Sequence, residues 1–230
     1  MTTIGILGTG RMAVRLAVEF AKLGHGVVLG SRTPERATHI TRGLEQQGIR
    51  PGDYHAAAAC EVVLPAMFLR DGLLETLRPF APQFEGKLYL DITNPFNADY
   101  TDFILPWDTS SAEEIQRVFP QARVVGAFKN VWWEVFDSPH FGGLVSDVFV
   151  VGDDDQAKRR FLALAEGMPF RFLDAGRLCN ARTVERMTLL SGELGQRLGY
   201  FPRMNYRLLG EPWSVGRQDR VKELIASPPG

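Results

Sequence analysis

Two glycines near the start of the chain have the spacing of a loop that binds phosphate. Gly8 and Gly10 stand in GILGTGRMA, directly after an apolar run and directly before a helical pattern. In a strand–loop–helix unit, the first glycine permits a tight turn and the second leaves room for a pyrophosphate beside the backbone. The helix that follows offers free N–H groups to the anion. Ala13 stands where a third glycine is usual, and alanine is accepted there. The loop therefore predicts a dinucleotide site.

The end of the next apolar run indicates which dinucleotide binds. NAD-binding folds usually place an acid about 20 residues after the glycines, where it holds the ribose hydroxyls. Here the sequence is LGSRTPER, with Ser31 and Arg32 and no acid before Glu35. An acid would repel a 2′-phosphate, whereas an arginine forms charge-assisted hydrogen bonds with it. We therefore expect NADP(H), held by Arg32 with help from Arg36. The alternative is that Arg32 is a solvated loop residue.

The elements that must position these residues follow an α/β pattern. Short apolar runs alternate with longer amphipathic ones, which is typical of a parallel sheet flanked by helices. The expected helices cover residues 11–23 and 180–199, and others begin after Thr33, after Ser110 or Ser111, and at about residues 153–155. The expected strands lie at about residues 3–7, 26–31, 61–66, 87–91, 123–128, 146–151 and 170–174.

The fold class is therefore α/β, a Rossmann-type doubly wound parallel sheet with a small helical C-terminal lobe. The alternation of strands and helices stops near residue 176. We expect an NADP-binding Rossmann domain over residues 1–176 and a helical lobe over residues 177–230, a region of dimerisation.

Composition narrows the class of protein. The 230 residues include 26 basic and 27 acidic side chains, and a net charge of -1 gives no support for nucleic-acid binding. No apolar run reaches the roughly 18 residues of a membrane span, and the first strand leaves no room for a signal peptide. The two cysteines, Cys60 and Cys179, lie outside any metal-binding spacing. We expect a cytoplasmic protein with reduced thiols and no metal site.

The sequence resembles the coenzyme F420-dependent NADP oxidoreductase family. The resemblance begins with GTGRMAVRLAVEFAKLGHGVVLGSR and continues through EVVLPAM, LYLDITNPF, ARVVGAF and LDAGRLCNARTVERMTLL, to about Gly210. It implies an NADPH-dependent oxidoreductase whose hydride acceptor is a deazaflavin such as coenzyme F420 or a related small acceptor. Some larger proteins with this module pass electrons to a flavin, and family members commonly pair through the C-terminal region. The resemblance therefore also implies a homodimer.

The resemblance assigns roles to matching positions. TNPF, which contains three of these positions, has the alternative of a plain strand-terminating turn. The pyrophosphate would lie along Thr9, Gly10, Arg11 and Met12, and the 2′-phosphate would contact Ser31, Arg32 and Arg36. The nicotinamide-side ribose would lie over Ala66 and Met67. The next strand would end at Thr93, Asn94 and Pro95, where ligands of open α/β sheets gather, with Pro95 on the acceptor side.

Two departures from the family pattern concern the acceptor. Arg15 stands where members that use the deazaflavin often have glycine, and KNVWW replaces a segment of small residues after the strand that ends in GAF. Trp132 and Trp133 offer flat surfaces for an aromatic ligand, while Lys129 could hold an anionic group or donate a proton. Lys129 and Asn130 should point to opposite sides of a strand end, so that only one reaches the cleft. We assign all four residues to acceptor binding.

Each of these residues also has a structural alternative. The tryptophans could pack in a core or a dimer interface, and Lys129 could pair with Glu134 or Asp137. His140 could be structural rather than an acid near the cleft, and the glycines at 142–143 suggest a mobile loop. We therefore name no catalytic residue. Hydride transfer between two cofactor rings needs no protein acid at the reacting carbon.

Two other functions stay open at this point. The first is an NADPH-dependent reductase of a small ketone, imine or activated alkene, which would need a proton donor. The second belongs to another class, an NADP-binding sensor or partner protein without turnover. The β-hydroxyacid dehydrogenases and imine reductases share a similar glycine loop but carry a long helical second domain, for which about 54 residues after position 176 are too few.

Overall fold

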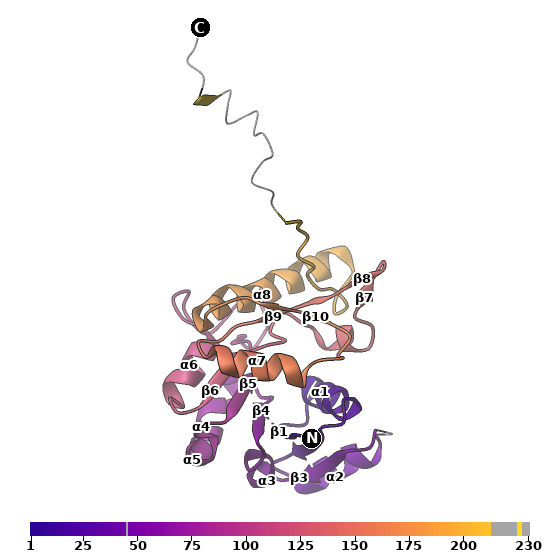
Figure 1. The fold of residues 1–230 in the computed structure, drawn as a ribbon, viewed down its shortest axis with the longest axis vertical. Coiled ribbons are helices and arrows are strands. Elements are labelled where there is room, and N and C mark those ends of the chain that lie inside the picture. The colour runs from indigo at the N-terminus through magenta and orange to yellow at the C-terminus, as the bar shows by residue number, and fades with distance from the viewer. Residues whose placement is uncertain (45, 213–224, 227–230) are drawn as a thin grey trace.

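The core of the fold is a six-stranded parallel sheet (Figure 1). The computed structural model describes residues 1–44, 46–212 and 225–226. The strand order is β3-β2-β1-β4-β5-β6, which is that of a doubly wound dinucleotide-binding fold, with its ligand crevice at the carboxyl ends of the central strands. The strands are β1 (Thr3–Leu7), β2 (Gly26–Gly30), β3 (Ile49–Gly52), β4 (Val62–Pro65), β5 (Leu88–Asp91) and β6 (Arg123–Gly126).

Helices connect the strands and cover both faces of the sheet. The apolar stripe of α1 packs into the core, where Leu16 and Phe20 are fully buried. Pro34 begins α2 after Thr33, and Ser110 caps α6 by accepting a hydrogen bond from the Glu113 amide. The helices are α1 (Arg11–Lys22), α2 (Pro34–Arg42), α3 (Tyr54–Ala58), α4 (Leu73–Leu77), α5 (Ala81–Phe84), α6 (Ser111–Val118), α7 (Asp155–Leu164) and α8 (Ala181–Leu198), with 3-10 turns η1 (Leu69–Asp71), η2 (Arg78–Phe80), η3 (Trp133–Phe136) and η4 (Leu178–Asn180).

The last two expected strands lie outside the main sheet. β9 (Asp147–Val150) and β10 (Arg171–Asp174) form a separate parallel pair. An isolated antiparallel bridge between Gly126 and Val151 connects that pair to β6, so this part of the sheet is not continuously parallel.

Three short strands were not expected from the sequence. β3 is an edge strand that contains Pro51, and an edge strand is one of the places in a sheet where a proline is tolerated. β7 (His140–Phe141) and β8 (Leu144–Val145) form a hairpin. Its two-residue turn is Gly142–Gly143, with φ values of 55° and 85°, the left-handed backbone that such turns require. The glycine pair expected in a mobile loop therefore forms a tight turn.

The helix α8 covers residues 181–198 of the expected C-terminal lobe, residues 177–230. Figure 1 shows it along the upper side of the molecule, beside β9 and β10. Its first turns contact α6, and Ala181 and Val184 share a hydrophobic core with Leu7 and Tyr89 of the main sheet. The boundary at residue 176 stays a prediction, and residues 213–224 and 227–230 of the expected lobe lie outside the described residues.

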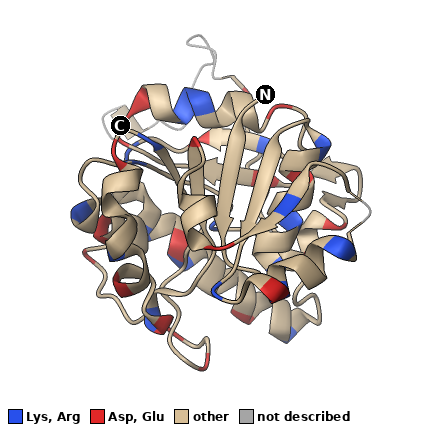
Figure 2. Cartoon of the chain, turned by 90° about the horizontal axis from the view of Figure 1, so that it is seen from below, with Lys and Arg blue, Asp and Glu red and all other residues tan. Residues whose placement is uncertain are grey.

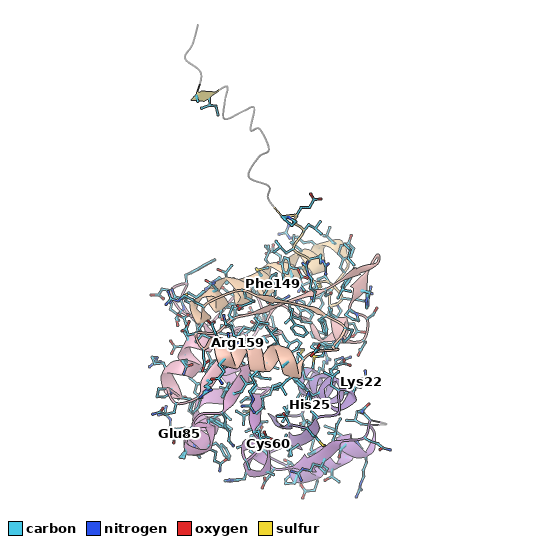
Figure 3. The ribbon with its side chains drawn as sticks, viewed as in Figure 1. Lys22, His25, Cys60, Glu85, Phe149 and Arg159 are labelled. Carbon is cyan, nitrogen blue, oxygen red and sulfur yellow. The ribbon has the colours of Figure 1, made fainter. Side chains whose placement is uncertain are left out.

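Charged residues of both signs are interspersed around the helices and loops (Figure 2). None of the described helices combines the length and the hydropathy needed to cross a membrane. Cys60, labelled in Figure 3, is buried near β4, and Cys179 is partly exposed; both are free thiols.

Asp147 anchors the segment that follows α8. Its carboxylate is fully buried at the start of β9 and accepts hydrogen bonds from the Arg171 guanidinium at 2.7 Å and from the Leu208 amide at 2.6 Å. Arg207 lies 3.4 Å from the same carboxylate. Although burial raises it, these hydrogen bonds and charges hold the pKa of Asp147 below its usual value. The Asp147 carboxylate thus connects the segment after α8 to both β9 and β10.

We expect Asp147→Asn to lower the free energy of unfolding at pH 7 by about 2 to 3 kcal/mol, because a buried network of charge-assisted hydrogen bonds loses its anion. The folded-state pKa is depressed, so the contribution is complete above the unfolded-state value of about 3.9 and is lost as the pH falls through the folded-state value. Urea denaturation at a series of decreasing pH values measures the free energy of unfolding of the parent and of Asp147→Asn. A stability difference that stays constant into acid would contradict this origin.

Candidate cofactor and acceptor site

The loop between β1 and α1 has the geometry of a phosphate cradle. Gly8 has φ 136°, and a Cβ there would lie 2.7 Å from the Ala66 carbonyl oxygen, so only glycine fits. Gly10 is the N-cap of α1, and a Cβ there would meet no atom within 4 Å. The space beside Gly10 is open, and the first turn of α1 contains no acidic residue. An anion can therefore approach the free N–H groups of the helix.

Side chains that could bind a 2′-phosphate gather beside this loop. The Nε of Arg36 donates to the Thr9 hydroxyl at 2.9 Å, which connects α2 to the glycine loop. The Ser31 hydroxyl accepts from the Thr33 amide at 3.1 Å, and Arg32 is exposed. Burial raises the pKa of Tyr54 on α3, and the nearby Arg32 guanidinium opposes the shift. Arg32 thus lies just after the end of β2, close to Tyr54 of α3.

A cleft of about 910 Å³ extends from the glycine loop to α8. It lies at the carboxyl ends of β1, β4 and β5, where the fold predicts a ligand. Among the predicted site residues, the cleft is lined by Gly10, Arg11, Met12, Ala66, Met67, Thr93, Asn94, Trp132 and Trp133. These nine residues, which come from the expected pyrophosphate, ribose and acceptor sets, therefore lie along one continuous surface.

Lys129 does not face this cleft, contrary to the expectation from the sequence. Its side chain is 0% exposed, and its ammonium contacts Asp91 at 2.5 Å and Glu185 at 2.8 Å. The same ammonium donates to the Thr93 carbonyl at 2.5 Å and to the Ser111 hydroxyl at 3.1 Å. The expected partners, Glu134 and Asp137, are replaced by these two carboxylates. Lys129 therefore cannot touch an acceptor in the cleft.

The buried cluster of Asp91, Lys129 and Glu185 contains two carboxylates and one ammonium. Burial lowers the pKa of Lys129, but the two carboxylates outweigh this effect and raise the pKa above its usual value. Burial raises the pKa of Glu185, which Lys129 opposes and Asp91 reinforces. Lys129 is therefore charged, and Glu185 binds a proton more readily than an exposed glutamate.

Asn130 and Pro95 are also placed away from the cleft. The Asn130 amide donates to the Asp147 carbonyl at 2.7 Å and to Asn205 at 2.9 Å, and its oxygen accepts from the Phe149 amide. Pro95 is buried, and its carbonyl accepts from the Ile104 amide. Lys129 and Asn130 do point into different networks, as strand alternation predicts, but neither side chain lines the cleft.

An aromatic wall forms one side of the cleft. Trp132 and Trp133 lie edge to face with ring centroids 5.8 Å apart, and Phe201 packs against both, at 5.0 Å and 5.6 Å. The Trp132 indole donates to the Ser191 hydroxyl of α8 at 3.0 Å. A Cβ on Gly192 would lie 2.9 Å from that indole, so glycine permits the close approach. The Trp132 ring is fixed against α8 on one side and lines the cleft on the other.

The two departures from the family pattern lie at one junction, between α1 and η3. Arg15 of α1 donates to Asp137 at 3.1 Å and lies 3.9 Å from Glu134, both beside the tryptophan pair in sequence. One turn earlier, the Arg11 guanidinium lies 4.7 Å from the centre of the Trp133 ring. Arg11 and Arg15 thus connect α1 to η3 and fix the aromatic wall.

Several residues that line the cleft could not be predicted from the sequence, because they come from segments without a motif. Thr188, Leu189, Gly192, Glu193 and Gln196 come from α8, whose apolar stripe predicts only a packed helix. Their one signal was the pair of small residues Ser191–Gly192. The rest of the group lies in loops: Phe68, Ile92, Phe96, Asp99, Tyr100, Thr101, Phe128, Val131 and Phe201.

Comparison with known proteins agrees with this site. The family described as NADP oxidoreductase coenzyme F420-dependent matches residues 3–95. The F420-dependent NADP reductase of Methanocaldococcus jannaschii is 30% identical in an alignment of 205 residues that covers 81% of this chain and 89% of that protein. The chain belongs to this F420-dependent NADP oxidoreductase family. It is therefore an NADP-dependent oxidoreductase, an enzyme rather than a sensor without turnover, and its cofactor is NADP(H).

Two further relatives extend the comparison. Metalloreductase STEAP3 of Rattus norvegicus is 33% identical over 187 residues, which cover 81% of this chain but only 36% of that protein. A crystal structure from Arthrobacter sp. FB24, named as a candidate F420-dependent NADP reductase, superposes with a TM-score of 0.82 at 26% identity, over 91% of this chain and 100% of that one. The fold of this family member is thus shared over nearly its whole described length.

The open space at Gly10 separates cofactor binding from folding. We expect Gly10→Ala to leave the melting temperature within about 1 °C of the parent, because its backbone (φ -81°) suits any residue and no atom is in contact. NADPH affinity should fall at least about tenfold, because the methyl group occupies the space of the pyrophosphate. Gly8→Ala should instead destabilise the fold. Fluorescence titration and thermal unfolding measure both; unchanged NADPH affinity in Gly10→Ala would contradict the assignment.

Proposed function

We propose that this enzyme transfers hydride between NADP(H) and a deazaflavin such as coenzyme F420. The observation that supports this proposal best is the cleft, which continues past the glycine loop to the aromatic wall of Trp132, Trp133 and Phe201. Such a wall suits a planar ring that stacks next to the nicotinamide. The naming of its relatives as F420-dependent NADP reductases supports the same acceptor.

In this proposal the protein binds and orients two rings. Bound NADP(H) supplies or accepts the hydride at its nicotinamide ring. The glycine loop would hold the pyrophosphate, Arg32 and Arg36 would hold the 2′-phosphate, and Ala66 and Met67 would contact the ribose on the nicotinamide side. Trp132 and Trp133 would hold the acceptor ring and keep water away, so that proximity and orientation provide the rate.

A small ketone or imine is the second candidate acceptor, since the cleft is also lined by groups that can donate a proton. The Tyr100 hydroxyl, for example, accepts a hydrogen bond from Arg70 at 2.8 Å and keeps its own proton available. Tyr100 also has φ 62°, an uncommon backbone for tyrosine that is frequent at functional sites.

The deciding experiment mixes the purified enzyme with NADPH and oxidised F420 and follows NADPH oxidation, with FMN, FAD, a cyclic imine and a ketone as parallel acceptors. Turnover that is fastest with F420 supports the proposal. Faster turnover with FMN or FAD would instead make a flavin the acceptor, and turnover only with the imine or ketone would move the function to carbonyl or imine reduction.

Arg32 should determine the preference for NADPH over NADH. We expect Arg32→Ala to weaken NADPH binding about tenfold or more and to leave NADH binding unchanged, because only NADPH has the 2′-phosphate. Titration of both nucleotides measures the ratio of their dissociation constants. Arg42→Ala, which removes an exposed arginine at the far end of α2, is the matched control and should keep the ratio of the parent.

We also propose that two copies associate through α8. Leu190, Leu194 and Leu198 follow one another at four-residue spacing and are 52%, 44% and 58% exposed. This stripe lies on a different face of the helix from Gly192 and Gln196, which line the cleft. Burial of such a stripe against a second copy would remove apolar surface from water.

Leu194→Glu is therefore expected to shift the protein to a monomer. Its unfolding temperature should change little at low protein concentration, because Leu194 is already partly exposed in the single chain. Sedimentation velocity gives the mass of the variant and of Leu144→Glu, a control at an exposed leucine of β8. A wild-type protein that sediments as a monomer, or a dimer that survives Leu194→Glu, would count against the α8 interface.

A further inference from the structure

The orientation of the Asn94 amide is determined by its contact with the Lys129 backbone. Asn94 Nδ2 donates to the Lys129 carbonyl oxygen at 2.7 Å. A carbonyl oxygen only accepts, so the amide cannot turn over without placing two oxygens against each other. Asn94 Oδ1 is therefore directed away from Lys129, and this buried atom has no hydrogen-bond partner among the described residues.

Lys129 contacts residues that line the cleft through both its backbone carbonyl and its side-chain ammonium. Its carbonyl accepts from Asn94 and also from the Thr188 hydroxyl of α8. Its ammonium donates to the carbonyl of Thr93, the residue before Asn94. Asn94, Thr93 and Thr188 all line the cleft, whereas Lys129 is fully enclosed. Three cleft residues thus contact one buried residue, Thr93 through the Lys129 ammonium and the other two through the Lys129 backbone carbonyl.

The surroundings of Lys129 make this arrangement rigid. Asp91 ends β5, and Glu185 lies on α8; both carboxylates contact the ammonium. Glu185 also accepts from the Ser111 hydroxyl at 2.6 Å and from the Ser111 amide at 3.1 Å. These partners surround the ammonium and exclude water. The Lys129 side chain therefore cannot move to another position without a large cost in free energy.

We propose that Asn94 Oδ1 accepts a hydrogen bond from the carboxamide NH2 of the nicotinamide, and that Lys129 is the positioning residue that aims it. A buried carbonyl-type oxygen without a partner is costly, and a ligand N–H that enters the cleft recovers that cost. NADP(H) is the cofactor of this enzyme, and its carboxamide is an N–H donor next to the reacting carbon. The hydrogen bond would fix the rotation of the ring and hence the face that exchanges hydride.

Nucleotide analogues test the contact without turnover. The 3-acetylpyridine analogue of NADP+ has a methyl group in place of the carboxamide NH2, whereas thionicotinamide NADP+ keeps the NH2. We expect the parent to bind NADP+ and the thio analogue about tenfold more tightly than the acetyl analogue, since the acetyl group leaves Oδ1 unpaired. In Asn94→Ala the three dissociation constants should become similar. Equal binding of all three by the parent, or an unchanged ratio in Asn94→Ala, would overturn the proposal.

The positioning role of Lys129 needs separate variants. Lys129→Met should lose the discrimination between NADP+ and the acetyl analogue, and it should transfer deuterium from both faces of 4-deuterated NADPH where the parent uses one. Lys158→Met is the matched control, because Lys158 is also nearly buried and paired with Asp155 and Asp174. It should lose stability but keep both the binding ratio and the face selection.

Asn94→Asp keeps the test independent of whether Lys129→Met folds. The aspartate retains an acceptor oxygen of the same shape but cannot donate to the Lys129 carbonyl. We expect it to lose the discrimination as Asn94→Ala does. If Asn94→Asp keeps the parent's ratio, or if folded Lys129→Met keeps the ratio and the single face, Lys129 has no positioning role.

Discussion

The ion cluster of Asp91, Lys129 and Glu185 is the interaction on which the cleft depends. It joins the end of β5, the segment after β6 and the helix α8 at one buried point. Isolation of such charges from water is expensive and is offset only by close pairing and further hydrogen bonds. Those bonds are present, from Ser111 to Glu185 and from Lys129 to the Thr93 carbonyl. Because a buried charge cannot move without its partners, the cluster fixes α8 against the edge of the sheet where the ligand binds.

The strand order explains why this edge must be fixed. Connections leave β1 and β4 toward opposite sides, which opens a crevice at their carboxyl ends. The glycine loop supplies one end of that crevice, where open space at Gly10 suits a phosphate. The sheet alone leaves the far side open, and α8 closes it with Thr188, Leu189 and Gly192. A cofactor site from the N-terminal half thus becomes a two-sided cleft only through a helix from the C-terminal part.

Residues whose role is set by local sequence could be predicted, and those set by tertiary contacts could not. The glycine loop, α1 and the buried strands follow from short-range patterns, and the structure has them within one or two residues of the expected bounds. Lys129 was assigned to the acceptor because it follows a strand end, but its partners are 38 residues before it and 56 after it, at Asp91 and Glu185. No local sequence pattern predicts an ion pair between residues so far apart in the chain. The α8 residues of the cleft were missed for the same reason.

The acceptor side shows how two sequence differences form one physical unit. Arg15 alone suggests a surface charge, and the tryptophan pair alone suggests either core or ligand contact. In the structure Arg15 binds Asp137 while Arg11 lies over Trp133, so both changes serve the junction of α1 and η3. A guanidinium over an indole is attracted to the ring face, and it also restricts the ring's rotation. The Trp133 ring is therefore held in place, with the positive charge of Arg11 over its face. The acceptor that we propose, a planar ring with an anionic group, would match this wall better than a small neutral ketone.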